Sequence, residues 1–125
     1  MKREKIGEIN DVVSNILKLP FKTDIPIILG ESNLEHMKKQ HPEDFEKYGD
    51  KISEIISSPD YVAKHPRKDS IEYIKVYIDE ETEEHVLVAV RATNSGVFYA
   101  RTLFVMSEEK VKRYTSKGAL HKYKK

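Results

Sequence analysis

Histidine and basic side chains are the groups in this sequence whose types suit proton transfer and charge stabilisation. The chain has five histidines and no cysteine, and no two histidines have the spacing of a helical zinc site. His36 lies three residues before Lys39, on the same face of a predicted helix. Because imidazole exchanges protons near neutral pH, His36 is a candidate acid or base for phosphodiester cleavage without a metal or cofactor. The alternative is a purely structural histidine that caps its helix.

A second set of candidates follows from strand alternation in the later half of the chain. Alternating apolar residues predict three antiparallel strands at about residues 70–78, 84–92 and 96–106. A polar turn at 79–83 and a hairpin turn at 94–96 are expected to join them. One face of this sheet is then apolar and is expected to pack on helices. The opposite, open face is predicted to carry Tyr73, Lys75, Tyr77, His85, Leu87, Arg91, Val97, Tyr99, Arg101 and Leu103.

Such a face suits a single-stranded nucleic acid. Lysine and arginine pair with phosphates, and tyrosine rings offer stacking surfaces for unpaired bases. Arginine also stabilises a pentavalent phosphate through its rigid fork of donors. The alternative is that this is only the solvated side of an antiparallel sheet.

Helical spacing dominates the first half of the chain and must position His36. It predicts a short helix that ends before Pro20, and a second helix with Ser32 as N-cap and Glu35 completing a capping box. A third helix is expected to begin at Pro42, and a last one at the N-cap Ser107. The apolar stripe of the third helix is Phe45, Tyr48, Ile52, Ile55 and Ile56. The segment 25–29, interrupted by Pro26, is expected to be an edge strand or an extended lead-in.

Together these elements predict the α+β class, with N-terminal helices packed on one face of a small antiparallel β-sheet. The 125 residues fit one domain, and no apolar run approaches the ~20 residues of a membrane-spanning helix. The start, MKREKIGEIN, lacks the apolar core of a signal peptide, so a cytoplasmic location is expected. The net charge of +1 conceals an asymmetry, because residues 85–125 carry nine Lys or Arg against two acidic residues. One side can therefore attract a polyanion.

Several short motifs occur in a recognisable order and spacing. They are His36, His41-Pro42, the Ile-rich segment 52–56, Pro59-Asp60-Tyr61-Val62 and Tyr99-Ala100-Arg101-Thr102. In this order, over about residues 25–120, the chain resembles the phage-borne branch of the barnase–EndoU–colicin–RelE nuclease superfamily, here called the BECR fold.

The resemblance implies a barnase/RelE-like layer of helices on an antiparallel sheet, with RNA bound on the open sheet face and cleaved without a metal. It implies a nuclease domain at 25–120, after a lead-in at 1–24 and before a basic tail at 121–125. It also implies a toxin-like protein of a phage or mobile element, with RNA as partner and an antidote or host protein as a further one. The expected catalytic residues are His36, Arg101, Thr102 and, from the face argument, Lys75. The expected RNA-binding residues are Lys39 and His41 beside the helical His36 and, from the face argument, Tyr73, Arg91 and Tyr99.

Strand alternation conflicts with one of these pairs. Neighbouring residues Arg101 and Thr102 point to opposite faces of a regular strand, so both can serve one site only at a bulge or a strand end. Two other functions stay open at this point. One is an RNA-binding module of the same fold without catalysis, and the other is a protein-interaction domain whose polar sheet face docks a partner.

Overall fold

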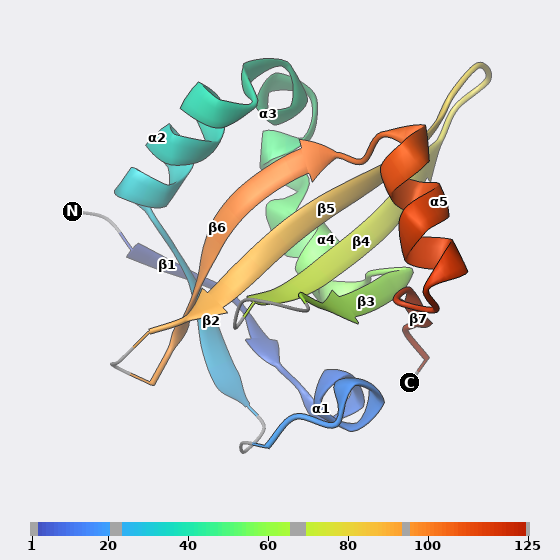
Figure 1. The fold of residues 1–125 in the computed structure, drawn as a ribbon. Helices are drawn as coiled ribbons and strands as arrows, with labels where there is room; N and C mark the ends of the chain where they lie inside the picture. Colours follow the sequence, from blue (N-terminus) through green and yellow to red (C-terminus); the bar gives the residue numbers. More distant parts are fainter. Residues whose placement is uncertain (1–2, 21–23, 66–69, 94–95, 125) are drawn as a thin grey trace.

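The structure, a computed structural model, describes residues 3–20, 24–65, 70–93 and 96–124 and belongs to the α+β class. Within these residues seven strands form one sheet in the order β1-β2-β6-β5-β4-β3-β7 (Figure 1). All neighbouring strands are antiparallel except β2 and β6, which pair in parallel. The strands are β1 (Arg3–Ile9), β2 (Ile25–Gly30), β3 (Tyr61–Lys64), β4 (Ser70–Ile78), β5 (Glu83–Ala92), β6 (Phe98–Val105) and β7 (His121–Lys122).

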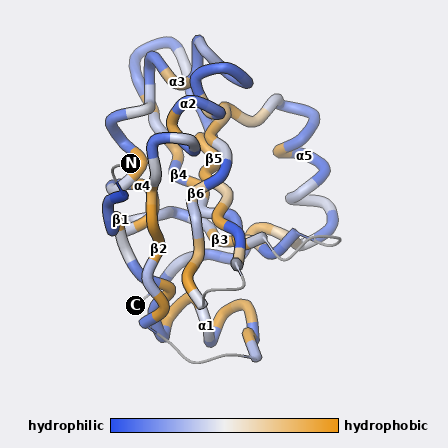
Figure 2. The backbone as a smooth tube through the Cα atoms, turned by 90° about the vertical axis from the view of Figure 1, so that its left-hand side faces the viewer, coloured by the Kyte–Doolittle hydropathy of each residue, from blue (hydrophilic) through white to orange (hydrophobic). Residues whose placement is uncertain are grey.

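The helices of the described residues lie on both sides of this sheet and along its length. They are α1 (Asp11–Leu17), α2 (Glu31–Gln40), α3 (Pro42–Tyr48), the 3₁₀ turn η1 (Gly49–Lys51), α4 (Ile52–Ser57) and α5 (Glu108–Ser116). Seen along the sheet, α4 lies on one side of it and α5 on the other (Figure 2). The helices as a whole therefore cover both faces: α4, from the N-terminal half, lies on one side of the sheet, and the C-terminal α5 on the other.

The larger core lies between α4 and the sheet. Ile55 of α4 is fully buried, as are Val86 and Val88 on the facing strand β5. Gly7 of β1 permits the close approach of α4, because a Cβ at this position would lie 2.8 Å from Cγ2 of Ile56. A smaller core lies on the other face, where Val111 and Tyr114 of α5 pack against the buried Ile74 and Leu87 of the sheet.

Helix α2 runs beside the second half of β6, where no described strand pairs with that edge (Figure 1). The parallel pairing of β2 with β6 covers only Ile27–Phe98 and Ile28–Tyr99. Met37 anchors α2, because its side chain is fully buried in the larger core. The next helix is tied to the end of β6 by Asp44, whose Oδ2 accepts a hydrogen bond from the amide N of Val105 at 3.0 Å. These contacts fix the helix that carries His36.

Several local predictions hold and others are wrong. Strands β4, β5 and β6 lie where alternation predicts them, and the Ser107 side chain caps α5 by accepting from the amide of Lys110. The N-cap of α2 is Gly30 rather than Ser32, and Asn33 closes the turn by accepting from the Gly30 amide at 2.9 Å. The predicted third helix is two helices, α3 and α4, joined by η1. Residues 94–95 of the expected hairpin turn lie outside the described residues.

The N-terminal segment and the strand at 25–29 also differ from expectation. Residues 3–9 form strand β1, and the first helix begins only after Asn10, whose side chain accepts from the Val13 amide at 3.0 Å. Strand β2 is not an edge strand, because it lies between β1 and β6. Its Pro26 lies opposite Glu8 of β1.

The predicted face of β4 is wrong by one residue. The turn between β4 and β5 pairs Ile78 with Glu83, so Tyr73 lies opposite Val88 and Lys75 opposite Val86. Partners directly opposite one another point to the same side of a sheet, and a shift of one residue reverses every side chain. Tyr73 and Lys75 therefore face α4, not the open side.

Tyr73 offers a test of this register. Its ring is fully buried, and within the described residues its hydroxyl has no hydrogen-bond partner. Leaving a buried hydroxyl unpaired costs about 1–3 kcal/mol, so Tyr73→Phe is expected to raise the free energy of unfolding by about 1 kcal/mol. Urea unfolding of both proteins measures this. If Tyr73→Phe instead lowers the free energy of unfolding by more than about 1 kcal/mol, the hydroxyl has a hydrogen-bond partner and the expectation is wrong.

Candidate active site

A cavity of about 330 Å³ lies on the sheet face that α5 partly covers. His36 of α2 lines the wall of this cavity that lies across from α5. Side chains of β4, β5 and β6 form its floor. The residues that line it are His36, His65, Ser70, Glu72, Ala89, Arg91, Arg101, Thr102, Phe104 and Lys110. This cavity, called the sheet cavity below, brings together four residues that the sequence nominates: His36, Arg91, Arg101 and Thr102.

The position of His36 follows from the burial of its neighbour. Met37 is fully buried in the core, and His36 is exposed one residue earlier on the same helix. Successive residues on a helix point about 100° apart, so anchoring Met37 also sets the direction of His36. The His36 ring can therefore exchange protons with solvent or a bound molecule while its helix stays fixed.

A β-bulge places Arg101 and Thr102 in the same cavity. Ala89 of β5 pairs with Thr102, whereas the next residue, Val90, pairs with Ala100. Arg101 is thus the extra residue of β6, and the regular alternation of side chains is interrupted there. Both side chains line the sheet cavity. The bulge removes the conflict between strand alternation and a shared site.

Glu72 lines the cavity but is not among the residues that the sequence nominates. Only 4% of it is exposed, and its Oε1 accepts a hydrogen bond from the hydroxyl of Tyr114 at 2.7 Å. Burial, followed by the hydrogen bond to Glu72, raises the pKa of Tyr114 well above its usual range, so this phenol stays protonated and remains a donor. Glu72 is the third residue of β4, and an acidic residue so near a strand end gives no sequence signal that separates it from an exposed position.

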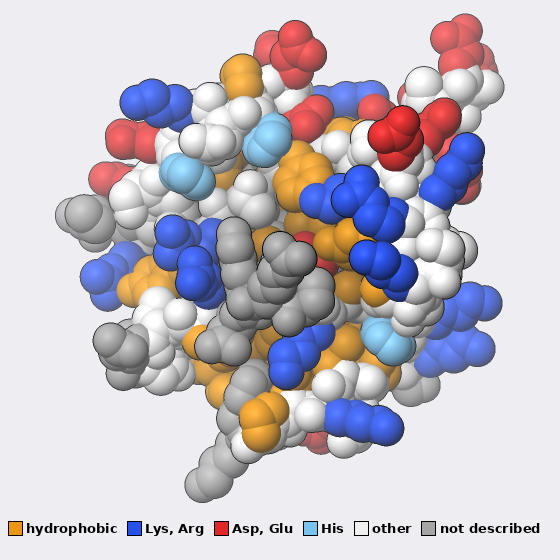
Figure 3. All heavy atoms as spheres, in the orientation of Figure 1, with side chains coloured by type: hydrophobic (Ala, Val, Ile, Leu, Met, Phe, Trp, Pro, Cys, Tyr) orange, Lys and Arg blue, Asp and Glu red, His pale blue; other side chains and the backbone are white. Residues whose placement is uncertain are grey.

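The cavity also contains a third fixed cation, Lys110 of α5. Its Nζ lies 4.5 Å from the centre of the Phe104 ring and 5.9 Å from that of Tyr114. Of the described residues, only Lys5 and Lys47 form ion pairs with carboxylates, so Arg91, Arg101 and Lys110 keep their charges free for a ligand. On this face, groups of Lys and Arg side chains flank the centre, one of them over α5 (Figure 3). The arrangement suits an anion.

The structure places the other nominated residues elsewhere. Lys75 lies on the opposite face of the sheet, where its Nζ donates to the carbonyl oxygen of Ser58 at 2.8 Å. Tyr73 is in the core, so neither residue can touch a ligand in the sheet cavity. The ring of His41 packs beside the cavity wall, 5.4 Å from the ring centre of Phe104. Lys39 is exposed on α2 and does not line the cavity.

Tyr99 borders the cavity side of the sheet. It lies opposite Arg91 in the β5–β6 pairing and therefore points to the same face. The guanidinium carbon of Arg3 lies 5.8 Å from the centre of its ring. A half-buried aromatic ring with two cations nearby is a suitable surface for stacking a base.

Within the described residues, no group of three or more His, Asp or Glu side chains has an arrangement that could hold a metal ion. None of the helices in that part of the chain has the length and apolar character needed to cross a bilayer.

Comparison with known proteins supplies the family. The sequence model of the family described as phage-Barnase-EndoU-ColicinE5/D-RelE like nuclease3 matches residues 4–113, which include every residue that lines the sheet cavity. No curated protein and no solved structure matches the chain. The match covers most of the sequence and agrees with the resemblance of its short motifs. The chain belongs to the phage-Barnase-EndoU-ColicinE5/D-RelE like nuclease3 family.

Proposed function

We propose that the chain is a metal-independent endoribonuclease of a phage or mobile element, with the sheet cavity as its active site. The observation that carries this proposal is the presence in one cavity of an imidazole, a buried carboxylate and two arginines that pair with no carboxylate of the described residues. Membership of a nuclease family supports it, because the substrate of a nuclease has a phosphodiester at the reacting position.

The acid and the base are His36 and Glu72. In RNA the ribose 2′-oxygen attacks the adjacent phosphorus, a bond to that oxygen forms, and the bond from phosphorus to the 5′-oxygen breaks. One group must accept the 2′-hydroxyl proton and another must protonate the leaving 5′-oxygen. The Glu72 carboxylate, oriented by Tyr114, accepts the first proton, and the His36 imidazolium donates the second. The products are a 2′,3′-cyclic phosphate and a 5′-hydroxyl.

The arginines stabilise the phosphorane between these two steps. Arg91 and Arg101 come from adjacent strands and line the same cavity. Each guanidinium presents a planar fork of donors that matches two phosphate oxygens. Such preorganised charges stabilise the transition state most when negative charge accumulates on the equatorial oxygens. With proton transfer and charge stabilisation both supplied by side chains, the mechanism needs no metal ion.

The choice of RNA over DNA rests on the same chemistry. The cavity lining includes no cysteine, and the mechanism assigns the attack to the substrate itself. Only a ribose has the required 2′-hydroxyl. Tyr99 and Arg3 offer a stacking surface beside the cavity for a base of a single strand.

The direct test compares RNA with DNA of the same sequence in the presence of EDTA. The purified chain is expected to cleave the single-stranded RNA and leave the DNA intact, which gel electrophoresis of end-labelled strands measures. Lys75→Ala serves as the control. Because Lys75 lies on the other face of the sheet, this variant is expected to cleave RNA at the normal rate. RNA that binds but stays intact would instead favour an inactive RNA-binding module. Cleavage only after a divalent metal is added would contradict the mechanism.

A further inference from the structure

A second cavity on the same side of the molecule continues the sheet cavity. It has a volume of about 350 Å³ and lies between α5 and the end of β3. It is called the α5 groove below, and its lining residues are Lys64, His65, Lys110, Arg113, Tyr114, Lys117 and Ala119. His65 and Lys110 line both cavities, so the two are contiguous.

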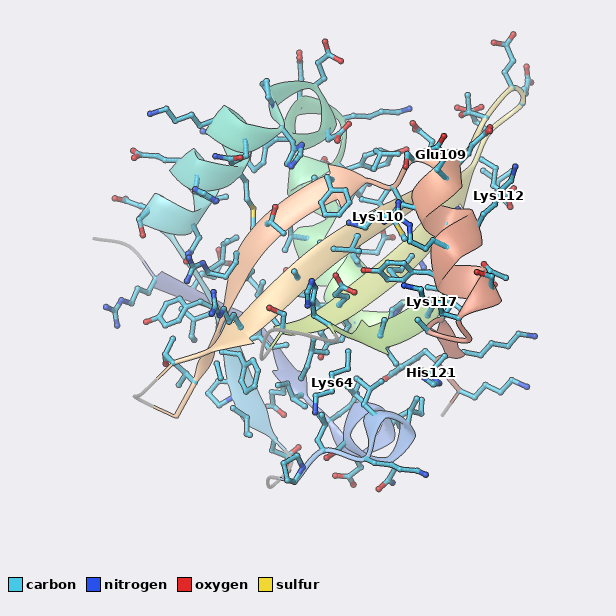
Figure 4. The ribbon with its side chains drawn as sticks, viewed as in Figure 1. Lys64, Glu109, Lys110, Lys112, Lys117 and His121 are labelled. Carbon is cyan, nitrogen blue, oxygen red and sulfur yellow. The ribbon has the colours of Figure 1, made fainter. Side chains whose placement is uncertain are left out.

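The α5 groove is basic because of helical spacing. Lys110, Arg113 and Lys117 follow one another at intervals of three and four residues, which places them on one face of α5. Lys110 and Lys117 extend from the helix over the sheet, and Lys112 extends from its other side (Figure 4). Lys64 adds a fourth cation from β3. Among the described residues, no carboxylate lines this groove, and none of these four cations forms an ion pair with another of them.

We propose that the α5 groove binds the phosphodiester backbone of the RNA strand on one side of the scissile phosphate. This inference rests on the proposed function, because it assumes that the scissile phosphate lies in the sheet cavity. From Lys110 to Lys117 the helix rises about 10 Å, which exceeds the spacing of neighbouring phosphates in a nucleic-acid strand. The groove therefore contacts more than one phosphate, and the preferred substrate is an extended strand rather than a dinucleotide.

Tyr114 and Lys110 connect the two cavities. Tyr114 lines the α5 groove, and its hydroxyl donates to Glu72 in the sheet cavity. Lys110 lies over the rings of both Phe104 and Tyr114, at the boundary of the two cavities. A strand bound along α5 thus passes directly beside the carboxylate assigned as base.

Charge reversal on α5 tests the inference without depending on catalysis. The probe is a single strand of about twelve nucleotides of 2′-O-methyl RNA, a length within the site sizes of single-strand binding proteins, and it has no free 2′-hydroxyl to attack phosphorus. The double variant Arg113→Glu/Lys117→Glu is expected to bind it at least tenfold more weakly than the unmodified chain. The dependence of log affinity on log salt is expected to be less steep by about 1.4, or 0.7 for each lost phosphate contact.

Lys112→Glu is the matched control. It reverses one charge on the same helix, half the change of the double variant, but Lys112 is exposed and lies beside Glu108 on the side away from the α5 groove. Its affinity is expected to stay within threefold of the unmodified chain. Equal losses in both variants, or no loss in the double variant, would overturn the inference. So would poly-glutamate that displaces the RNA at equal charge concentration, since the groove would then be a general site for acidic chains.

Cleavage of ordinary RNA separates this inference from the proposed function. The double variant is expected to lower kcat/KM for the longer RNA more than for a dinucleotide, so the ratio of the two falls at least fivefold. If the unmodified chain cleaves both substrates and the ratio does not change, the α5 groove is not part of the substrate path. If the unmodified chain binds the probe but cleaves nothing, the proposed function fails and the binding result still decides the inference.

Discussion

Replacing His36 by alanine is expected to lower kcat for RNA cleavage by about 10²- to 10⁴-fold, the usual contribution of one positioned acid or base. His36 is exposed on α2 and lines the sheet cavity, so its removal takes away a proton donor and leaves the core intact. The midpoint of thermal unfolding should change little. Single-turnover cleavage of end-labelled RNA in EDTA measures the rate of the cleavage step separately from product release.

Glu72→Gln is the companion change on the floor of the cavity. Glutamine keeps an oxygen that can accept from the Tyr114 hydroxyl, but it cannot accept the 2′-hydroxyl proton. A loss of about 10²- to 10⁴-fold is again expected. Because the acid and the base serve the same reaction as a unit, the double variant His36→Ala/Glu72→Gln should be far less impaired than the product of the single losses.

His121→Ala is the matched control for His36. His121 is exposed on β7, opposite Val62 of β3, and does not line the sheet cavity. Normal cleavage is expected from this variant. If His36→Ala also cleaves normally, the imidazole has no part in the reaction and the assignment of the acid is wrong.

Arg101→Ala is expected to lower kcat and kcat/KM together by about 10²- to 10³-fold, or about 2.7–4 kcal/mol of transition-state stabilisation. The bulge points Arg101 into the cavity, and within the described residues no carboxylate pairs with it. Arg101→Lys keeps the charge but loses the fork of donors, so it should recover only part of the activity.

The other face of the sheet provides the control for Arg101. Lys75→Ala also removes a strand-borne cation. It should lower the stability only by what the hydrogen bond with Ser58 contributes and leave cleavage unchanged. If Lys75→Ala and Arg101→Ala lose the same activity, the effect is one of overall charge. If Arg101→Ala raises KM and leaves kcat unchanged, Arg101 binds RNA but does not stabilise the phosphorane.

The sequence was enough to find the strands of the central meander and its helical partners, because alternation and helical spacing are local. It was not enough to pair them, because register depends on the length of each turn. Alternation alone groups the even-numbered residues of β4 with the even-numbered residues of β5 on one face. The pairing of Ile78 with Glu83 instead puts the even-numbered residues of β4 on the same face as the odd-numbered residues of β5. Tyr73 and Lys75 therefore face α4. The strand pattern also does not predict β1, β3 and β7, because four of the seven residues of β1 are charged and β3 and β7 have only four and two residues.

The cavity itself could be predicted in part. Short motifs predict His36, Arg101 and Thr102, and strand alternation requires a bulge or a strand end to bring the last two together, which the structure has as the bulge at Arg101. Glu72 could not be selected, because one acidic residue near a strand end resembles an ordinary exposed position. Only the packing of α5, which buries Glu72 beneath Tyr114, separates it from the other acidic residues. That contact joins residues far apart in the chain.

The chemical identity of the new RNA ends tests the central claim most directly. The purified chain, incubated with single-stranded RNA in EDTA, is predicted to leave 2′,3′-cyclic phosphate and 5′-hydroxyl ends, which mass spectrometry of the fragments identifies. His36→Ala at the same concentration should leave almost none. Ends with a 3′-hydroxyl and a 5′-phosphate, or cleavage that appears only with added divalent metal, would contradict attack by the 2′-oxygen under acid and base catalysis by His36 and Glu72.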